Sequence, residues 1–356
     1  MKTVTKRFDL SRRRVLQGAA GLAGAAALGA PGLAQAEDKG TIIVGTWGGD
    51  YARLLNKNIE KPFLIPEGWK VVQDQAGDPQ RRAKMMAERR LPRGTSDVQG
   101  LSASNIYQMG AAGVCEPIDY SRIPNAPHLL ESMKYEYGVG QIYSGMVPVY
   151  NPDVVADGDA PGSYKAVFDP KWGESLGIID IQYQYTMVAA ALAAGGTVTD
   201  IDPGKKLLLE VRKAGCRIYP TNEAFAQGLK AEEFGTGIMW KARTVQWQNA
   251  GINVKSKAPT EGTLPYVSGF SIPKNAPNMD GAYAYLNAML EPAAQENFAE
   301  DMGYNPTVDN ANIPAELNAR IGFTPEEIAN LAPLDYGFLT DHDAEMKEWW
   351  DKEFKG

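Results

Sequence analysis

Short apolar runs alternate with amphipathic segments along this 356-residue chain, and this alternation constrains the fold more than any other feature. Ile42–Val44 precedes a helical pattern over 50–60, and Leu176–Ile179 precedes another over 185–194. Strands that alternate with helices are typical of largely parallel sheets. The chain is therefore predicted to be an α/β protein. The same order recurs at 71–72 with 78–90 and at 97–98 with 106–112, and a further helix is expected over 280–290.

The first 36 residues have the order of an export signal. Ser11-Arg12-Arg13-Arg14-Val15-Leu16 is close to the twin-arginine pattern, an apolar run covers 19–33, and Ala34-Gln35-Ala36 is a cleavage site. The apolar run is too short and too rich in glycine to be a comfortable membrane anchor. We expect a cleaved, twin-arginine-type signal at 1–36 and a periplasmic mature protein, with general secretory export as the alternative route.

The mature chain would be acidic and long. Removal of the signal lowers Lys+Arg from 36 to 30 and Asp+Glu from 43 to 42, so the net charge changes from −7 to about −12. Such a charge disfavours nucleic acid and anionic membrane surfaces as partners. The remaining 320 residues exceed one typical core and suit two lobes. Two scattered cysteines, Cys115 and Cys216, allow one disulfide, but we expect two buried thiols.

No motif predicts catalysis, a metal site or a cofactor. His128 and His342 lack metal-ligand spacing, and the chain contains no G-x-S-x-G elbow. Gly45-Thr46-Trp47-Gly48-Gly49 matches neither a dinucleotide fingerprint nor a P-loop. The acidic run Asp341–Glu345 lacks the glycine and the terminal glutamate of a calcium loop, and we interpret it as a solvated helix start.

Five stretches, in order between Ser96 and Thr307, resemble the polyamine branch of the type II periplasmic solute-binding proteins, the capture subunits of ABC importers. The resemblance implies two α/β lobes, each a mostly parallel sheet flanked by helices, with a hinge of crossing strands that closes on a ligand. It also implies a small-molecule solute, a transient contact with an ABC permease in the inner membrane, a monomer, and no enzyme activity or cofactor. The stretches are Ser96–Asp119, Ser163–Asp180, Phe234–Trp240, Val267–Lys274 and Met302–Thr307.

The lobe boundaries follow from two β-rich segments that are candidates for the crossing strands, 145–151 and 266–273. We expect lobe 1 to comprise 37–144 and 268–310, and lobe 2 to comprise 145–267. The C-terminal helices, 311–356, are expected to pack on the lobes.

Trp47 follows an apolar run and precedes two glycines. In the family the first strand ends at the cleft in an aromatic residue, so the resemblance implies that Trp47 is a wall for the ligand. Gly48 and Gly49 would let the backbone approach that ligand. Packing between core elements is the alternative for Trp47. Trp240 is implied as a second cleft aromatic, because it follows the strand-like Gly237-Ile238-Met239.

Further contacts are implied by position. Ser102 and Ser104 follow the strand at Asp97-Val98 and match the contact loop of the first lobe in the family. The aromatic residues Tyr143, Tyr183 and Tyr266 are candidates for the cleft, and each would serve almost as well in a core.

The sequence departs from the family at the carboxylates that hold ammonium groups, which need paired charge when buried. By registration these positions fall on Ile181, Gln184 and Ser268, none of which is acidic. Asp50 and Asp180 are nearby candidates to replace them.

Two cations follow Trp240. Arg243 offers a forked contact that suits a carboxylate or a phosphate, with a solvent-facing position as the alternative. Lys241 is expected to face solvent. The ligand is therefore predicted to be polyamine-like or, given the missing carboxylates, an organic anion. A secreted enzyme or a sensor subunit on the same scaffold are the competing interpretations.

Overall fold

The computed structural model describes residues 38–356, so the signal predicted for 1–36 lies outside the described residues. The described residues form one compact unit. Within the described part, two large hydrophobic cores are separate: one contains Val44 and Phe270, and the other contains Val188 and Phe225. We call the elements around the first core the first lobe and those around the second core the second lobe.

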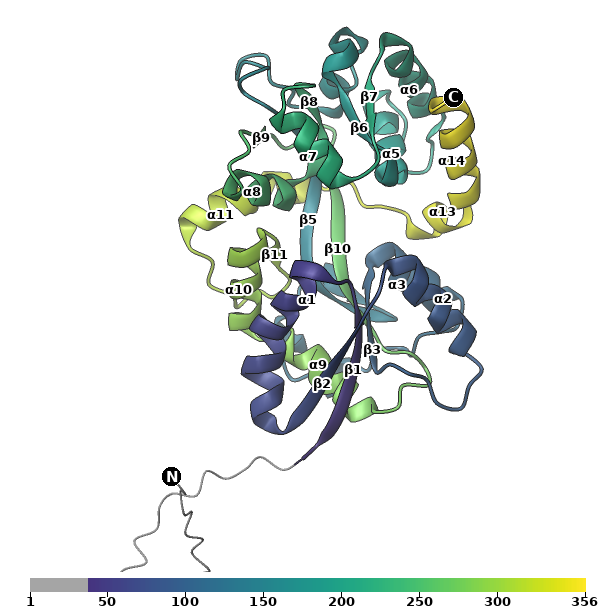
Figure 1. Cartoon of the computed structure of the whole chain (residues 1–356), viewed down its shortest axis with the longest axis vertical. Coiled ribbons are helices and arrows are strands. Elements are labelled where there is room, and N and C mark those ends of the chain that lie inside the picture. The colour runs from purple at the N-terminus through teal and green to yellow at the C-terminus, as the bar shows by residue number, and fades with distance from the viewer. Residues whose placement is uncertain (1–37) are drawn as a thin grey trace, which may run out of the picture. The chain divides into compact units, whose positions relative to one another are not determined.

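Two long strands, β5 (Gly138–Tyr150) and β10 (Leu264–Ser271), run between the lobes (Figure 1). They pair antiparallel from Met146 opposite Leu264 to Val139 opposite Phe270. On β5 the first core ends at Ile142 and the second begins at Met146. Both candidate crossing segments of the sequence lie on or beside these strands, and the lobe boundaries at 144/145 and 267/268 stay predictions.

The first lobe contains a three-stranded parallel unit in which β1 lies between β2 and β3. β10 joins β3 antiparallel, so the sheet order is β2-β1-β3-β10-β5-β11, and β4 also pairs with β5. The strands are β1 (Gly40–Thr46), β2 (Trp69–Gln75), β3 (Val98–Ser102), β4 (Lys134–Tyr135) and β11 (Asn305–Pro306). The helices are α1 (Gly49–Leu55, continued by a wider helical segment to Leu64), α2 (Asp78–Glu88), α3 (Ala103–Ala111), α9 (Met279–Ala288) and α10 (Pro292–Met302).

In the second lobe, β8 and β9 pair antiparallel with the far half of β5, while β6 and β7 form a parallel pair. The strands are β6 (Gly177–Ile179), β7 (Arg217–Tyr219), β8 (Thr236–Trp240) and β9 (Lys255–Ser256). The helices are α4 (Tyr164–Val167), α5 (Tyr183–Ala193), α6 (Asp202–Ala214), α7 (Asn222–Lys230) and α8 (Lys241–Asn249).

The C-terminal segment contacts both lobes. α13 packs on α3 of the first lobe, and α14 packs on α5 of the second. Trp350 and Phe354, just after α14, are fully buried in the second core. The helices of this segment are α11 (Ala315–Ile321), α12 (Pro325–Ala329), α13 (Tyr336–Asp341) and α14 (Asp343–Trp349).

The α/β class predicted from alternation is confirmed, and each helix predicted there has a counterpart shifted by a few residues. The sheets are more mixed than expected, because every strand that pairs with β5 does so antiparallel. Cys115 and Cys216 are buried, unbonded thiols in different cores, as predicted. Within residues 38–356 no helix combines the length and apolar character needed to cross a membrane.

Candidate functional site

Two cavities that share Tyr266 lie where residues of both lobes meet. The larger has a volume of about 580 Å³, and we call it the Trp47 compartment. The smaller has a volume of about 270 Å³, and we call it the Trp240 compartment. In the first, the first lobe contributes Trp47, Tyr51 and Tyr304, and α8 contributes Arg243 and Gln246. In the second, α3 contributes Ser104, β8 contributes Trp240, and the C-terminal segment contributes Asp343.

The crossing strands form the floor that the two lobes share. Ile142 on β5 is opposite Ser268 on β10, and both line the Trp47 compartment. Tyr266, two residues before Ser268, points to the same face, because side chains alternate along a strand. The same alternation corrects one prediction: Tyr143 follows Ile142, packs against the first core and lines neither compartment.

Trp47 lies at the carboxyl end of β1, just before the glycine turn, and its indole is partly exposed to the Trp47 compartment. Tyr51, one turn later on α1, meets it edge to face at 5.3 Å between ring centroids. Gly48 lines the compartment, whereas Gly49 does not and has a φ of 68°. That left-handed φ explains why glycine is needed at the second position of the turn.

Trp240 ends β8 and is only 7% exposed. Tyr185 of α5 meets it edge to face at 4.5 Å, and Tyr266 covers it at 4.8 Å with the rings inclined by 34°. Trp240 lines the smaller compartment and also belongs to the second core. Trp240 is therefore a core residue that also faces this cavity, and its role as a wall for a ligand stays a prediction.

Asp343, which the sequence predicts to lie in a solvated helix start, lines the Trp240 compartment. Asp343 accepts hydrogen bonds from the hydroxyl of Tyr183 and, at 2.8 Å, from Nε2 of Gln184. The prediction of a helix start was correct, since α14 begins at Asp343. Its place in the cavity could not be predicted, because it depends on how the C-terminal segment docks between the lobes.

Ile181, Gln184 and Ser268, the positions where the family has ammonium-binding carboxylates, carry none. Neither Asp50 nor Asp180 fully replaces them. Ile181 is 60% exposed, and Ser268 is buried with its hydroxyl directed at the carbonyl of Leu101. Asp180 accepts hydrogen bonds from Trp350 and Lys355 and lines neither compartment, so it is corrected as a substitute. Asp50 lines the Trp47 compartment but pairs with Arg53 at 3.1 Å.

Arg243 of α8 lines the Trp47 compartment, and its nearest described carboxylate, that of Glu223, is 3.8 Å away. Burial raises the pKa of Tyr266 and of Tyr304, and the charge of Arg243 opposes both shifts. The guanidinium therefore acts on the two phenols that line the compartment.

Lys241, predicted to face solvent, is instead half-buried: its ammonium group lies 4.6 Å from the Phe323 ring centroid and donates to the carbonyl of Gly322.

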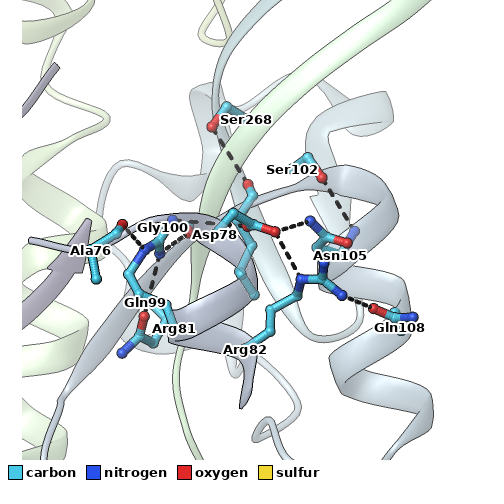
Figure 2. Close-up of polar contacts among 11 residues, drawn as sticks. Ala76, Asp78, Arg81, Arg82, Gln99, Gly100, Ser102, Asn105, Gln108 and Ser268 are labelled. Atoms are coloured by element: carbon cyan, nitrogen blue, oxygen red, sulfur yellow. Dashed lines mark hydrogen bonds and ion pairs between the residues drawn. The ribbon is translucent and has the colours of Figure 1, made fainter. Parts of the chain in front are cut away.

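Ser102 and Ser104 lie at the start of α3 and line the Trp240 compartment, together with Tyr183 and Gln184. The Ser102 hydroxyl caps α3 by accepting from the backbone amide of Asn105 at 3.4 Å (Figure 2).

Within the described residues, no three His, Cys, Asp or Glu side chains are grouped so as to hold a metal ion. The chemistry available in both compartments is therefore binding through aromatic faces, hydroxyls, arginines and a few carboxylates.

The chain belongs to the bacterial extracellular solute-binding proteins, whose family model matches residues 61–325. It is a type II, polyamine-binding-like solute-binding protein of an ABC transporter and not an enzyme, as the sequence resemblance predicted. The match ends before α13 and α14, so the segment that carries Asp343 lies beyond it.

Two periplasmic binding proteins resemble this chain in sequence, and a solved structure resembles it in fold. The spermidine/putrescine-binding periplasmic protein of Escherichia coli (strain K12) is 24% identical over 296 residues, 79% of this chain and 81% of the relative. The putrescine-binding periplasmic protein SpuD of Pseudomonas aeruginosa (strain UCBPP-PA14) is 28% identical, covering 73% of this chain and 76% of its own length. The solved Atu4243-GABA receptor superposes with a TM-score of 0.76 at 21% identity, covering 87% of this chain and 96% of the receptor.

Proposed function

We propose that this chain is the periplasmic substrate-binding subunit of an ABC importer that captures a small organic solute between its two lobes. The aromatic residues Trp47, Tyr266 and Trp240 would form the walls, and β5 and β10 would form the hinge. Six relatives of the polyamine type are named as periplasmic, which supports the proposed location. An ABC permease would be the partner to which the loaded protein delivers its solute.

The main support for the ligand class is that Arg243 lines a compartment with aromatic walls. Arg243 is one-third exposed, and its closest carboxylate partner, Glu223, is 3.8 Å away and mostly exposed. A guanidinium so weakly paired can give a forked contact to a ligand carboxylate. Trp47 and Tyr304 would then enclose the body of the ligand. The preferred ligand is a small solute with at least one carboxylate.

A polyamine-like ligand is the second candidate, and Asp343 is the observation that favours it. Its carboxylate lines the Trp240 compartment beside Trp240 and Tyr185, so an ammonium group there would meet both a charge and aromatic faces. The relatives are named for putrescine or spermidine, whereas the Atu4243 neighbour is named as a GABA receptor. Asp343 at one end and Arg243 at the other would suit a ligand that bears both an amine and a carboxylate.

Native mass spectrometry of the protein purified without dialysis tests this function most economically. The expected spectrum contains an extra mass that is lost on collisional activation and is identified as a small carboxylate-bearing solute. Small-angle scattering with that solute should then show a smaller radius of gyration, because the lobes close. An unchanged radius under saturating ligand would contradict hinge closure, and co-purified spermidine or putrescine would select the second candidate.

A sensor subunit would use the same cleft, and gene context separates it from an importer subunit. Permease and ATPase genes beside this gene would support the importer, and a histidine-kinase gene would support the sensor.

A further inference from the structure

Arg81 of α2 is a buried cation that the proposed function does not use. The residue is 1% exposed. Its Nε donates to the carbonyl of Ala76 at 3.0 Å, and its Nη1 donates to the carbonyl of Gly100 and, at 3.4 Å, to Oε1 of Gln99 (Figure 2). Its buried Nη2 has no hydrogen-bond partner among the described residues. These hydrogen bonds fix the positive charge of Arg81 inside the first lobe, next to the cleft.

That charge lies against the cleft tryptophan. The guanidinium carbon of Arg81 is over the Trp47 ring, 4.4 Å from the centroid. Trp47 lines the compartment, whereas Arg81 does not. A Cβ added at Gly100 would approach the Trp47 ring to 3.0 Å, so the ring is also fixed from the β3 side. One face of the Trp47 indole is therefore covered by a buried cation.

The negative charge nearest to Arg81, that of Asp78, is shared with Arg82. Asp78 accepts from Nε of Arg82 at 2.8 Å and from Asn105 at 2.9 Å, both through Oδ2 (Figure 2). Its Oδ1 has no hydrogen-bond partner within residues 38–356 and lies 3.9 Å from Nη2 of Arg81. The nearby Asp74 is paired with Lys84 at 2.6 Å. Two arginines therefore share the single carboxylate of Asp78, which leaves one positive charge in excess.

We propose that Arg81 is a specificity-determining residue that acts through Trp47 and biases the Trp47 compartment toward anionic groups. The inference rests on the proposed function of the cleft and sharpens its ligand class. Indole faces attract cations because of the ring quadrupole. One face of Trp47 is already satisfied by Arg81, and a ligand group on the other side would lie roughly 8 Å from the guanidinium, given ordinary contact distances. At that range a ligand ammonium is repelled and a carboxylate is attracted.

Quenching of Trp47 fluorescence by iodide and by caesium measures this bias without any cognate ligand. The Trp47 signal is the difference between each protein and the same protein carrying Trp47→Phe. In the wild type, iodide should quench several-fold more strongly than caesium. In Arg81→Gln the iodide-to-caesium ratio should fall toward that of a neutral site, and Arg81→Lys should restore most of it because the charge is kept.

Asp78→Asn is the matched variant, because it removes the shared countercharge and leaves Arg81 in place. Its iodide-to-caesium ratio should rise above that of the wild type, opposite to Arg81→Gln. Opposite shifts in the two variants support the proposal. Equal ratios in all proteins would overturn it, and so would a fall in both variants, since that result reports loosened packing rather than charge.

Titration calorimetry with four-carbon probes links the bias to binding. Succinate, 4-aminobutyrate and putrescine share a chain length and differ in charge. Arg81→Gln should weaken succinate relative to putrescine by about tenfold, as expected for charges that distance apart at intermediate dielectric. If the wild type binds none of the probes, the proposed ligand class fails while the quenching ratios still decide the role of Arg81. If relative affinities are unchanged in Arg81→Gln, the specificity role of Arg81 is wrong.

Discussion

Trp47 and Trp240 lie at the carboxyl ends of strands in opposite lobes, yet their surroundings differ. Trp47 is partly exposed, follows β1 into a glycine turn and has Arg81 stacked on one face. Trp240 is 7% exposed, is enclosed by Tyr185 and Tyr266, and belongs to the second core. Under the proposed function the first contacts a ligand, whereas the second also packs in the core of its own lobe. On that proposal, two residues at similar strand ends divide binding and stability between them.

The largest effect is expected from Trp240→Ala, and it should appear in stability. Removing a buried tryptophan from a core typically costs about 3–5 kcal/mol. Denaturant unfolding should show this loss, and Trp240→Phe should recover much of it because a ring remains between the two tyrosines. Trp47→Ala is the matched control in the other lobe, and a comparable loss there would contradict the proposed division.

Trp47→Ala should instead reduce binding. Losing one stacked aromatic face removes about 1.5–3 kcal/mol of apolar burial, which corresponds to roughly tenfold to hundredfold in affinity. Calorimetry with the solute identified by native mass spectrometry measures the change, and Trp47→Phe should lose less. An affinity within twofold of the wild type would mean that Trp47 is only a packing residue.

Arg243→Ala should reduce affinity selectively for ligands that bear a carboxylate. A charge-assisted hydrogen bond contributes about 1.5–3 kcal/mol, although partial exposure of Arg243 places the expected effect at the lower end, near tenfold. Arg243→Lys should restore only part of the loss, because lysine lacks the planar fork. Carboxylate binding that survives Arg243→Ala unchanged would leave the aromatic compartment intact and remove Arg243 from the site.

Asp343→Asn should give the smallest effect of the series. Asparagine keeps an acceptor for Tyr183 or Gln184 but removes the charge, so only a ligand with an amine in the Trp240 compartment should lose affinity. We expect a loss of severalfold for 4-aminobutyrate and none for succinate. An equal loss for both probes in calorimetry would show that Asp343 acts by holding α14 in place.

Much of the fold could be predicted from sequence, because strand and helix periodicities are local. The crossing segments were also recognisable, since β5 and β10 are β-rich and continuous. Tyr143 was misplaced because the sequence does not reveal which strand face meets the cleft; Ile142 takes that face. Arg81 and Asp343 were missed because their roles arise only when α2 packs under Trp47 and α14 docks on α5.

The central claim is that this cleft prefers a carboxylate-bearing solute to a polyamine, and calorimetric titration of the wild type with spermidine and putrescine tests it most directly. Each missing charge-assisted contact is worth about 1.5–3 kcal/mol, so two of them should weaken amine binding by roughly 10² to 10⁴. The account predicts no measurable heat at micromolar polyamine and tighter binding of a carboxylate-bearing probe. Micromolar spermidine binding would contradict it and would make Asp343 and Asp50 the clamp.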